Sequence, residues 1–248
     1  MANNDYKAPE SKVIVALDYA DAASALYLVN QLDPALCKLK VGKELFTAAG
    51  PQLVEKLVEK NFSVFLDLKF HDIPTTVKKA CQAASSLGVW MLNVHASGGS
   101  AMMNAAAEGV DIGSQGSMHN INHKPFLIAV TVLTSSNQAT LHEIGVENTI
   151  ENQVLKLAKL TQAAGLNGVV CSALEAQLLR QHLPNDFLLV TPGIRPASAS
   201  LDDQSRVLTP SQALRMGVNY LVIGRPITQA AKPIEALIAI NQEIQVLQ

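Results

Sequence analysis

The chain has 248 residues, of which 48% are hydrophobic and 16% are charged. This composition suits a folded protein with a large core and is unlike that of a disordered chain. The formal net charge of −2 gives no overall field that would attract nucleic acid or an anionic membrane surface, so any anion site must be local.

The cysteines and the first ten residues indicate in which cellular compartment the protein is expected. Cys37, Cys81 and Cys171 are scattered and form no CxxC pair, which argues against a disulfide framework or a zinc site and favours a reducing environment. Residues 1–10 form a polar tail without the apolar segment of a signal peptide. No run reaches the ~18 apolar residues that a membrane helix needs. We therefore expect a cytoplasmic protein without a membrane partner.

Apolar runs of strand length alternate with helix-like segments along the chain. Strands are predicted at 12–18, 36–41, 63–67, 89–95, 126–133, 167–171, 187–190 and 219–223. Helices are predicted at 22–32, 44–60, 75–87, 101–108, 149–164, 173–181, 211–216 and 234–247. Buried strands that alternate with amphipathic helices are typical of a parallel sheet covered by helices.

Eight strand–helix units in a chain of this length predict a single (β/α)8 TIM barrel over residues 1–248, preceded by the polar tail 1–10. An open dinucleotide-binding sheet is disfavoured because the first strand is followed by 18–21, Asp-Tyr-Ala-Asp, and not by a glycine-rich turn. Two loops, 135–148 and 193–209, are longer than connection requires. In a barrel both lie on the face where active sites form, so they are candidate lids.

Three charged residues, Asp67, Lys69 and Asp72, follow the apolar run of the third strand. Side chains alternate between the faces of a strand, so Asp67 and Lys69 point the same way. Such charges cost free energy at the end of a buried strand unless they form ion pairs or take part in a functional site. One interpretation is a structural ion pair that caps the strand. The other is a charge network at the mouth of a barrel.

Further polar residues stand at the carboxyl ends of other predicted strands, which converge on one mouth of a barrel. They are Asp18, Lys40, His95, Thr134, Gly224 and Arg225. Taken singly, Lys40 is better explained as a surface lysine and His95 as a core histidine, but their joint placement favours a site. Lys38 faces the same way as Lys40 and is expected at the opposite, lower rim.

A phosphate site is predicted where the last strand ends. Gly224 permits close backbone approach, Arg225 offers a bidentate donor, and a helix begins directly after them. Gly193 and Arg195 follow the seventh strand, and barrels commonly hold phosphate after strands seven and eight. The structural alternative is that Arg225 pairs with a surface acid.

Most of these residues lie within segments that resemble those of the orotidine 5′-monophosphate decarboxylase family, and the resemblance covers nearly the whole chain. The segments are 15–18 (VALD), 39–42 (LKVG), 65–74 (FLDLKFHDIP), 130–135 (VTVLTS), 191–195 (TPGIR) and 223–228 (IGRPIT). The Asp-x-Lys-x-x-Asp core is shared with related sugar-phosphate decarboxylases and aldolases. Its extension from His71 to Pro74, together with the two phosphate loops, is much more specific.

The resemblance implies conversion of orotidine 5′-monophosphate to uridine 5′-monophosphate, in de novo pyrimidine synthesis, without cofactor or metal. It also implies a homodimer with shared active sites. The implied charge array is Lys40, Asp67, Lys69 and, from the partner subunit, Asp72. The implied substrate contacts are Asp18, Lys40 and the partner's Thr76 on ribose, Thr134 on the pyrimidine, and Arg195, Gln204, Gly224 and Arg225 on phosphate.

Two other readings remain open at this stage. The first is a Mg²⁺-dependent sugar-phosphate decarboxylase or aldolase that uses Asp67 and Asp72 on the same barrel. The second is a non-catalytic binder of a phosphoribosyl ligand. Nucleic-acid binding is disfavoured because the chain has no basic or aromatic-rich stripe.

Overall fold

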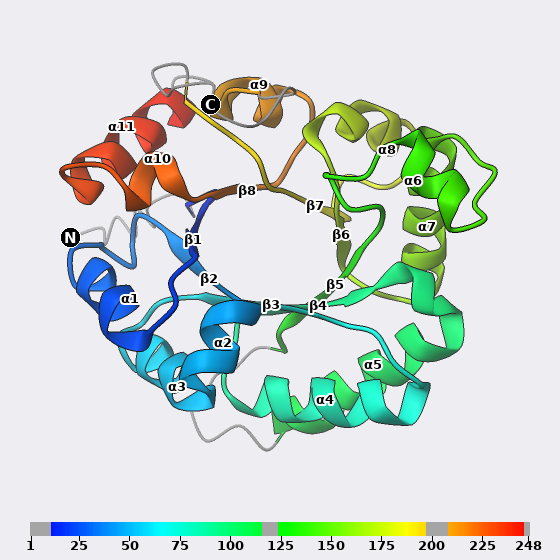
Figure 1. The fold of residues 1–248 in the computed structure, drawn as a ribbon, viewed down its shortest axis with the longest axis horizontal. Coiled ribbons are helices and arrows are strands. Elements are labelled where there is room, and N and C mark those ends of the chain that lie inside the picture. Colours follow the sequence, from blue (N-terminus) through cyan, green and yellow to red (C-terminus); the bar gives the residue numbers. More distant parts are fainter. Residues whose placement is uncertain (1–10, 116–123, 197–207, 246–248) are drawn as a thin grey trace, which may run out of the picture.

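The computed structural model describes residues 11–115, 124–196 and 208–245. Its parallel strands close into a barrel in the sequence order β1 to β8 (Figure 1). The strands are β1 Val13–Leu17, β2 Lys38–Gly42, β3 Val64–Phe70, β4 Met91–His95, β5 Phe126–Val130, β6 Gly168–Val170, β7 Leu188–Thr191 and β8 Tyr220–Ile223. The first strand pairs with both β2 and β8, so the expected TIM barrel is confirmed.

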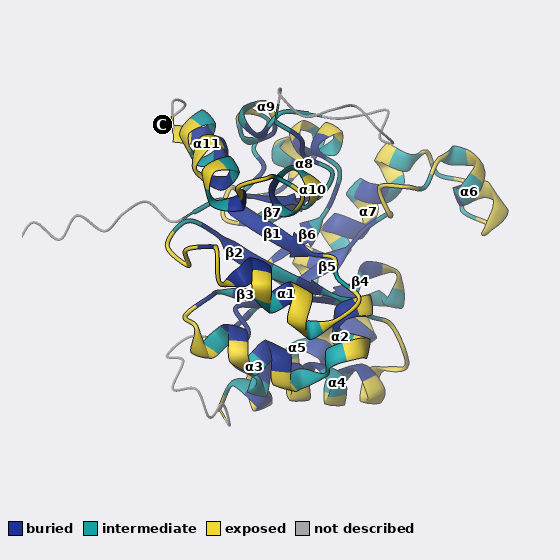
Figure 2. Cartoon of the chain, turned by 60° about the vertical axis from the view of Figure 1, so that its left-hand side comes forward, coloured by how far each residue is buried: buried dark blue, intermediate teal, exposed yellow. Residues whose placement is uncertain are grey.

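Helices surround the barrel and turn their buried faces toward it (Figures 1 and 2). They are α1 Ala22–Val29, α2 Lys43–Ala49, α3 Pro51–Glu59, α4 Pro74–Ser86, α5 Gly99–Gln115, α6 Gln138–Glu143, α7 Ile150–Ala163, α8 Ala176–His182, α9 Pro210–Arg215, α10 Arg225–Thr228 and α11 Pro233–Gln245. Short 3-10 turns, η1 Ala96–Gly98 and η2 Ala173–Glu175, precede α5 and α8. No helix in the described ranges is long and apolar enough to cross a membrane.

The alternation of side chains along the strands separates two cores. Ile14 and Ala16 of β1 belong to a cluster inside the barrel with Phe65, Met91 and Tyr220. The alternating residues of β1, Val13, Val15 and Leu17, belong to a larger cluster beneath the helices. The inner core fills the barrel and leaves the carboxyl ends of the strands to form a site.

The amino-terminal end of the barrel holds a buried cation. Lys38, the first residue of β2, is 5% exposed. Its Nζ lies 4.8 Å from the ring centroid of Trp90 and 5.6 Å from that of Tyr220. Contact with aromatic faces offsets part of the cost of burying the charge. The prediction for Lys38 thus agrees with its place at the rim opposite the candidate site.

The predicted helix over 44–60 is wrong as a single element. It is two helices, α2 and α3, because Gly50 adopts φ +68° and Pro51 starts the second helix. Glycine tolerates this left-handed conformation, and proline is suited to the first turn of a helix, where its missing N–H costs nothing.

Other segments also differ from the prediction. The helix expected at 101–108 extends over Gly99–Gln115 as α5. The candidate lid 135–148 contains α6, whose first turn is capped because the Asn137 side chain accepts from the Thr140 N–H. This helix stands away from the barrel body (Figure 2). Much of the second candidate lid, 193–209, lies outside the described residues.

Candidate active site

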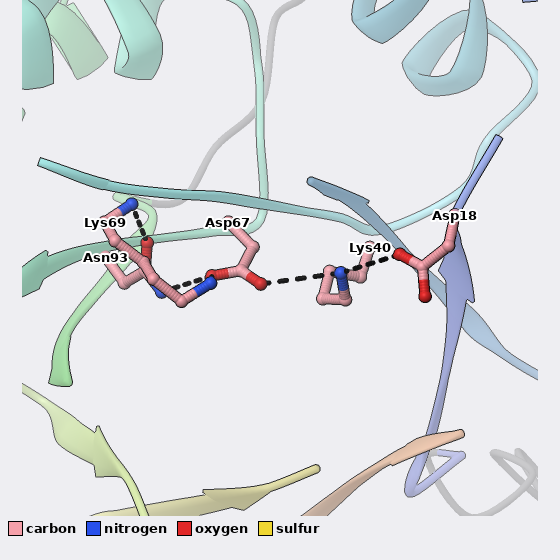
Figure 3. Close-up of polar contacts among 5 residues, drawn as sticks. All are labelled: Asp18, Lys40, Asp67, Lys69 and Asn93. Carbon is pink, nitrogen blue, oxygen red and sulfur yellow. Dashed lines mark hydrogen bonds and ion pairs between the residues drawn. The ribbon is translucent and has the colours of Figure 1, made fainter. Parts of the chain in front are cut away.

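Four charged side chains of alternating sign form a row along the ends of three neighbouring strands (Figure 3). Asp18 follows β1, Lys40 lies on β2, and Asp67 and Lys69 lie on β3. The Lys40 Nζ lies 3.4 Å from Asp18 Oδ1 and 3.4 Å from Asp67 Oδ2. The Lys69 Nζ lies 2.6 Å from Asp67 Oδ1. The sequence prediction that Asp67 and Lys69 face the same way holds in the structure.

Asp67 is the centre of this row and is buried at 9% exposure. Burial alone raises the pKa of its carboxyl group, but the positive charges of Lys40 and Lys69 lower it. Hydrogen bonds from Lys69 and Asn93 act in the same direction, and the net effect holds the pKa of Asp67 below its ordinary value. Asp67 is therefore ionised at neutral pH and keeps two ammonium groups in place beside it.

Asn93 belongs to this cluster, although the sequence interpretation did not single it out (Figure 3). It lies on β4, its Nδ2 donates to Asp67 Oδ1 at 2.7 Å, and its Oδ1 accepts from the Lys69 backbone N–H at 2.8 Å. The signal that could have found it is a fully polar amide inside the otherwise apolar run Met91–Val94.

His95 ends β4 beside the row and is half-buried. Its ring centroid lies 5.5 Å from that of His71. Burial, followed by the charges of His71, Lys43 and Lys69, lowers the pKa of His95 below its ordinary value, and Asp67 opposes this only in part. The imidazole is therefore neutral at pH 7, which leaves the positive charge of the row on the two lysines.

A cavity of about 350 Å³ opens beside the charged row. The sequence-predicted residues that line it are Asp18, Lys40, Asp67, Lys69, Thr134, Gly224 and Arg225. Apolar side chains of β5 to β8, among them Val130, Val190 and Val222, also line the cavity, together with Gly193 and Ile194. The cavity thus joins an ionised row, an apolar wall and an arginine, which suits a ligand with a flat ring and an anionic group.

Three of the predicted site residues that the structure describes do not line this cavity. Asp72 and Thr76 are exposed near the start of α4, and Asp72 Oδ1 accepts from the Ile73 N–H at 2.6 Å. Arg195 is 8% exposed, and its backbone N–H donates to Leu208 O at 3.2 Å. Gln204 lies outside the described residues.

The described residues contain no cluster of three or more histidine, cysteine, aspartate or glutamate side chains that could hold a metal ion. The environment of Asp67 is also unfavourable for a divalent cation. Its two carboxylate oxygens already face two ammonium groups, within 3.4 Å and 2.6 Å. A cation placed there would be repelled by both lysines.

Comparison with known proteins gives a consistent result. The model of the family described as "Orotidine 5'-phosphate decarboxylase / HUMPS family" matches residues 11–240. A protein of Nitrosococcus oceani named orotidine 5′-phosphate decarboxylase is 60% identical over 235 residues, 95% of this chain and 98% of that one. One of the same name from Chromobacterium violaceum is 58% identical over 236 residues, 95% of this chain and 92% of that one.

Solved structures show the same likeness. Orotidine 5′-phosphate decarboxylase from Lactobacillus acidophilus superposes with a TM-score of 0.84 and 39% identity, covering 94% of this chain and 99% of that one. An uncharacterized conserved protein from Geobacillus kaustophilus superposes with a TM-score of 0.80 and 37% identity, over the same shares of the two chains.

Proposed function

The chain belongs to the orotidine 5′-phosphate decarboxylase / HUMPS family, and from this membership we propose that it is an orotidine 5′-phosphate decarboxylase. It removes CO₂ from orotidine 5′-monophosphate to give uridine 5′-monophosphate, a step of de novo pyrimidine synthesis. The observation that carries the proposal is the Lys69 ammonium, held against Asp67 at the wall of the cavity.

The chemistry requires a positive charge close to the reacting carbon. Loss of CO₂ from C6 of the pyrimidine leaves the electron pair of the broken bond on C6, where no adjacent carbonyl can delocalise it. The Lys69 ammonium stabilises this carbanion electrostatically and then transfers a proton from Nζ to C6. Lysine is left neutral and regains its proton from water.

Asp67 and Lys40 prepare this step before the substrate arrives. Asp67 holds the Lys69 ammonium at 2.6 Å and the Lys40 ammonium at 3.4 Å, so the charges are preorganised. Asp67 also places a negative charge next to the departing carboxylate, which raises the free energy of the bound substrate relative to the transition state.

The rest of the cavity suits the rest of the nucleotide. Asp18 and Lys40 bind the ribose hydroxyls, and Thr134 contacts the pyrimidine. Arg225 and Gly224, with Arg195 and Gln204, bind the phosphate. The phosphate is distant from the reacting carbon, so its binding energy is available to close loops over the site.

The proposal includes a homodimer in which each site is completed by the partner subunit. Asp72 of the partner subunit completes the charge row, and Thr76 of the partner subunit contacts the ribose. In support, Asp72 and Thr76 of this chain are exposed, and Ile73 between them is an apolar residue with 66% exposure. Three buried free cysteines fit action in the reducing cytoplasm.

The Mg²⁺-dependent alternative needs Asp67 as a metal ligand. Two lysines compete for that carboxylate, which favours the metal-free reaction. The non-catalytic alternative leaves the costly burial of Asp67 beside Lys69 without a purpose, because a binder needs only the ribose and phosphate contacts.

One assay separates these functions: the loss of absorbance of orotidine 5′-monophosphate in EDTA, with Lys69→Ala as the control. We expect turnover by the wild-type protein and none above background by the variant. Turnover that EDTA abolishes and Mg²⁺ restores would support the metal-dependent alternative. Absence of turnover by the wild-type protein with and without Mg²⁺ would overturn the proposal.

A further inference from the structure

Strand β3 contains a bulge at its functional residues. Its pairing with β4 joins Leu66 to Leu92 and then Phe70 to Val94, so four steps along β3 lie against two along β4. The extra residues fall at Asp67, Leu68 and Lys69, opposite Asn93. Bulges of this kind redirect side chains and interrupt the backbone ladder, and both effects need compensation.

The backbone of Lys69 is the strained point of this bulge. Its φ is +53°, in the left-handed region that residues with a Cβ rarely adopt. Because the register of β3 and β4 shifts here, the Lys69 N–H donates to a side chain, the Oδ1 of Asn93, at 2.8 Å. The side chain of Asn93 therefore takes the place of a backbone acceptor.

The same amide also holds the carboxylate of Asp67. Asn93 Nδ2 donates to Asp67 Oδ1 at 2.7 Å, the oxygen that accepts from Lys69 Nζ at 2.6 Å (Figure 3). Asn93 thus closes a ring that runs through the Lys69 backbone, the Lys69 side chain and Asp67. Asp67 Oδ2 is left to face Lys40 at 3.4 Å. Asn93 itself is 0% exposed, so bulk solvent does not reach these bonds.

We propose that Asn93 is a positioning residue for the decarboxylation, an inference that rests on the proposed function. It stabilises the left-handed backbone of Lys69 and orients Asp67, and so directs the proton-donating Nζ to the reacting carbon. One planar group must supply a donor to the carboxylate and an acceptor to the N–H, which an asparagine does and an aliphatic residue does not.

The effect should fall on the chemical step more than on binding. The groups proposed to bind phosphate follow β7 and β8, far along the barrel from β4. Misplacement of a catalytic group by about 1 Å costs on the order of 10²-fold in rate. We expect Asn93→Ala to lower kcat by roughly that factor, whereas KM and the affinity for uridine 5′-monophosphate stay close to wild type.

The matched control is Asn167→Ala. Asn167 Oδ1 accepts from the Leu127 N–H of a neighbouring strand at 2.8 Å, the same kind of contact, but at the amino-terminal end of the barrel. We expect this variant to keep the wild-type kcat. The inference would be overturned if folded Asn93→Ala kept a kcat within a factor of two of wild type. It would also be overturned if Asn167→Ala lost as much kcat as Asn93→Ala does.

Asn93→Asp provides a second variant of nearly unchanged shape, with a distinctive pH profile. Protonated, the introduced carboxyl group donates to Asp67 and accepts from Lys69 as the amide does. Ionised, it repels Asp67. Other charged or titratable groups lie around this position. Lys69 is in direct contact, and Lys40 is linked to it through Asp67. His95 lies on β4 itself, and His71 lies next to His95.

We therefore expect the kcat of Asn93→Asp, relative to wild type, to rise as the pH falls. If Asn93 had only a structural role, the loss of kcat would be the same at every pH. A ratio of variant to wild-type kcat that does not change with pH would therefore contradict the inference. This profile also decides the matter if Asn93→Ala does not fold.

Failure of the proposed function is distinguishable from failure of this inference. If the wild-type protein does not turn over the nucleotide, crystal structures of ligand-free wild type and Asn93→Asp at high pH still test the positioning. A Lys69 backbone that leaves the left-handed region, or an Nζ that leaves Asp67, would support the inference. An unchanged Lys69 would overturn it.

Discussion

Lys40 stands between two carboxylates, with its Nζ 3.4 Å from Asp67 Oδ2 on one side and 3.4 Å from Asp18 Oδ1 on the other. The two acids differ in exposure, because the Asp67 side chain is 12% exposed and that of Asp18 is 69% exposed. Charges near solvent are screened, so the buried contact with Asp67 is the stronger of the two. The row therefore changes from a buried centre, where Lys40 contacts Asp67, to a solvent-facing end at Asp18 that is suited to the hydroxyl groups of a ligand.

Lys69→Ala tests the proposed proton donor. Removing both the general acid and the charge that stabilises the carbanion should lower kcat by at least about 10³-fold. Binding of uridine 5′-monophosphate should survive, because phosphate and ribose contacts remain. Steady-state kinetics and calorimetric titration measure the two effects. Lys232→Ala is the control, since Lys232 forms an exposed pair with Glu235 at 2.7 Å. A Lys69→Ala variant that keeps more than a tenth of the wild-type kcat would contradict the mechanism.

Asp67→Asn tests the electrostatics of the row through stability. The pKa of Asp67 is lowered from 3.8 in the folded protein, so its contribution to stability is complete above about pH 4 and is lost as the pH falls through the folded value. At pH 7 the variant, with its two lysines left without a buried counter-ion, should be less stable by about 3–5 kcal/mol.

Urea unfolding of wild type and Asp67→Asn at pH 7, 4 and 3 measures this difference. The gap in unfolding free energy should narrow on acidification, because protonation removes the same charge in the wild type. A gap that widens as the pH falls would show that Asp67 does not titrate below its ordinary value.

His95→Gln tests the environment of the half-buried imidazole. The pKa of His95 is lowered from 6.5, so folding favours its neutral form and the wild type loses stability as the pH falls from 6.5 through the folded value. The variant lacks this titration. Its free energy of unfolding relative to that of the wild type should therefore rise as the pH is lowered from 7.5 to 5.5. His182→Gln, at an exposed position, serves as the comparison. A difference in unfolding free energy between His95→Gln and wild type that stays constant over this pH range would contradict the expectation.

The barrel was predictable because its signals are local. Alternation of apolar strands with helices needs only neighbouring residues. The pleat also predicted that Asp67 and Lys69 face the same way, although the structure brings them together across a bulge. The convergence of Asp18, Lys40 and Thr134 on one cavity then follows from closure of the barrel.

The bulge in β3 and the role of Asn93 were not predictable in the same way. Both depend on the register between β3 and β4, which is set by packing between strands that are more than twenty residues apart. The helix break at Gly50 and Pro51 did carry a local signal, a glycine–proline pair, which the periodicity of the apolar residues outweighed in the prediction.

Gly109→Ala tests the close contact of α4 and α5. A Cβ at Gly109 would lie 2.2 Å from the Lys78 carbonyl oxygen of α4, so one helix must move away from the other. Overpacking of this kind costs about 1–3 kcal/mol, which thermal or urea unfolding would detect. Asn104→Ala, at an exposed position of the same helix, is the control. Equal stability of Gly109→Ala and wild type would show that the helices separate without cost.

The shared site is tested by mixing two inactive variants. If each site uses Lys69 of one protomer and Asp72 of the partner subunit, a heterodimer of Lys69→Ala and Asp72→Ala contains one intact site and one that carries both changes. Random exchange of a 1:1 mixture makes half of the dimers heterodimers, so about a quarter of all sites should be restored.

A mixture of Lys69→Ala with Lys40→Ala is the matched control for this exchange. Both lysines belong to the same protomer's row, where each lies within 3.4 Å of Asp67, so no heterodimer contains an intact site. Activity should therefore return in the first mixture and not in the second. If native mass spectrometry verifies heterodimers and the first mixture stays at the level of its parents, Asp72 acts within its own chain or not at all.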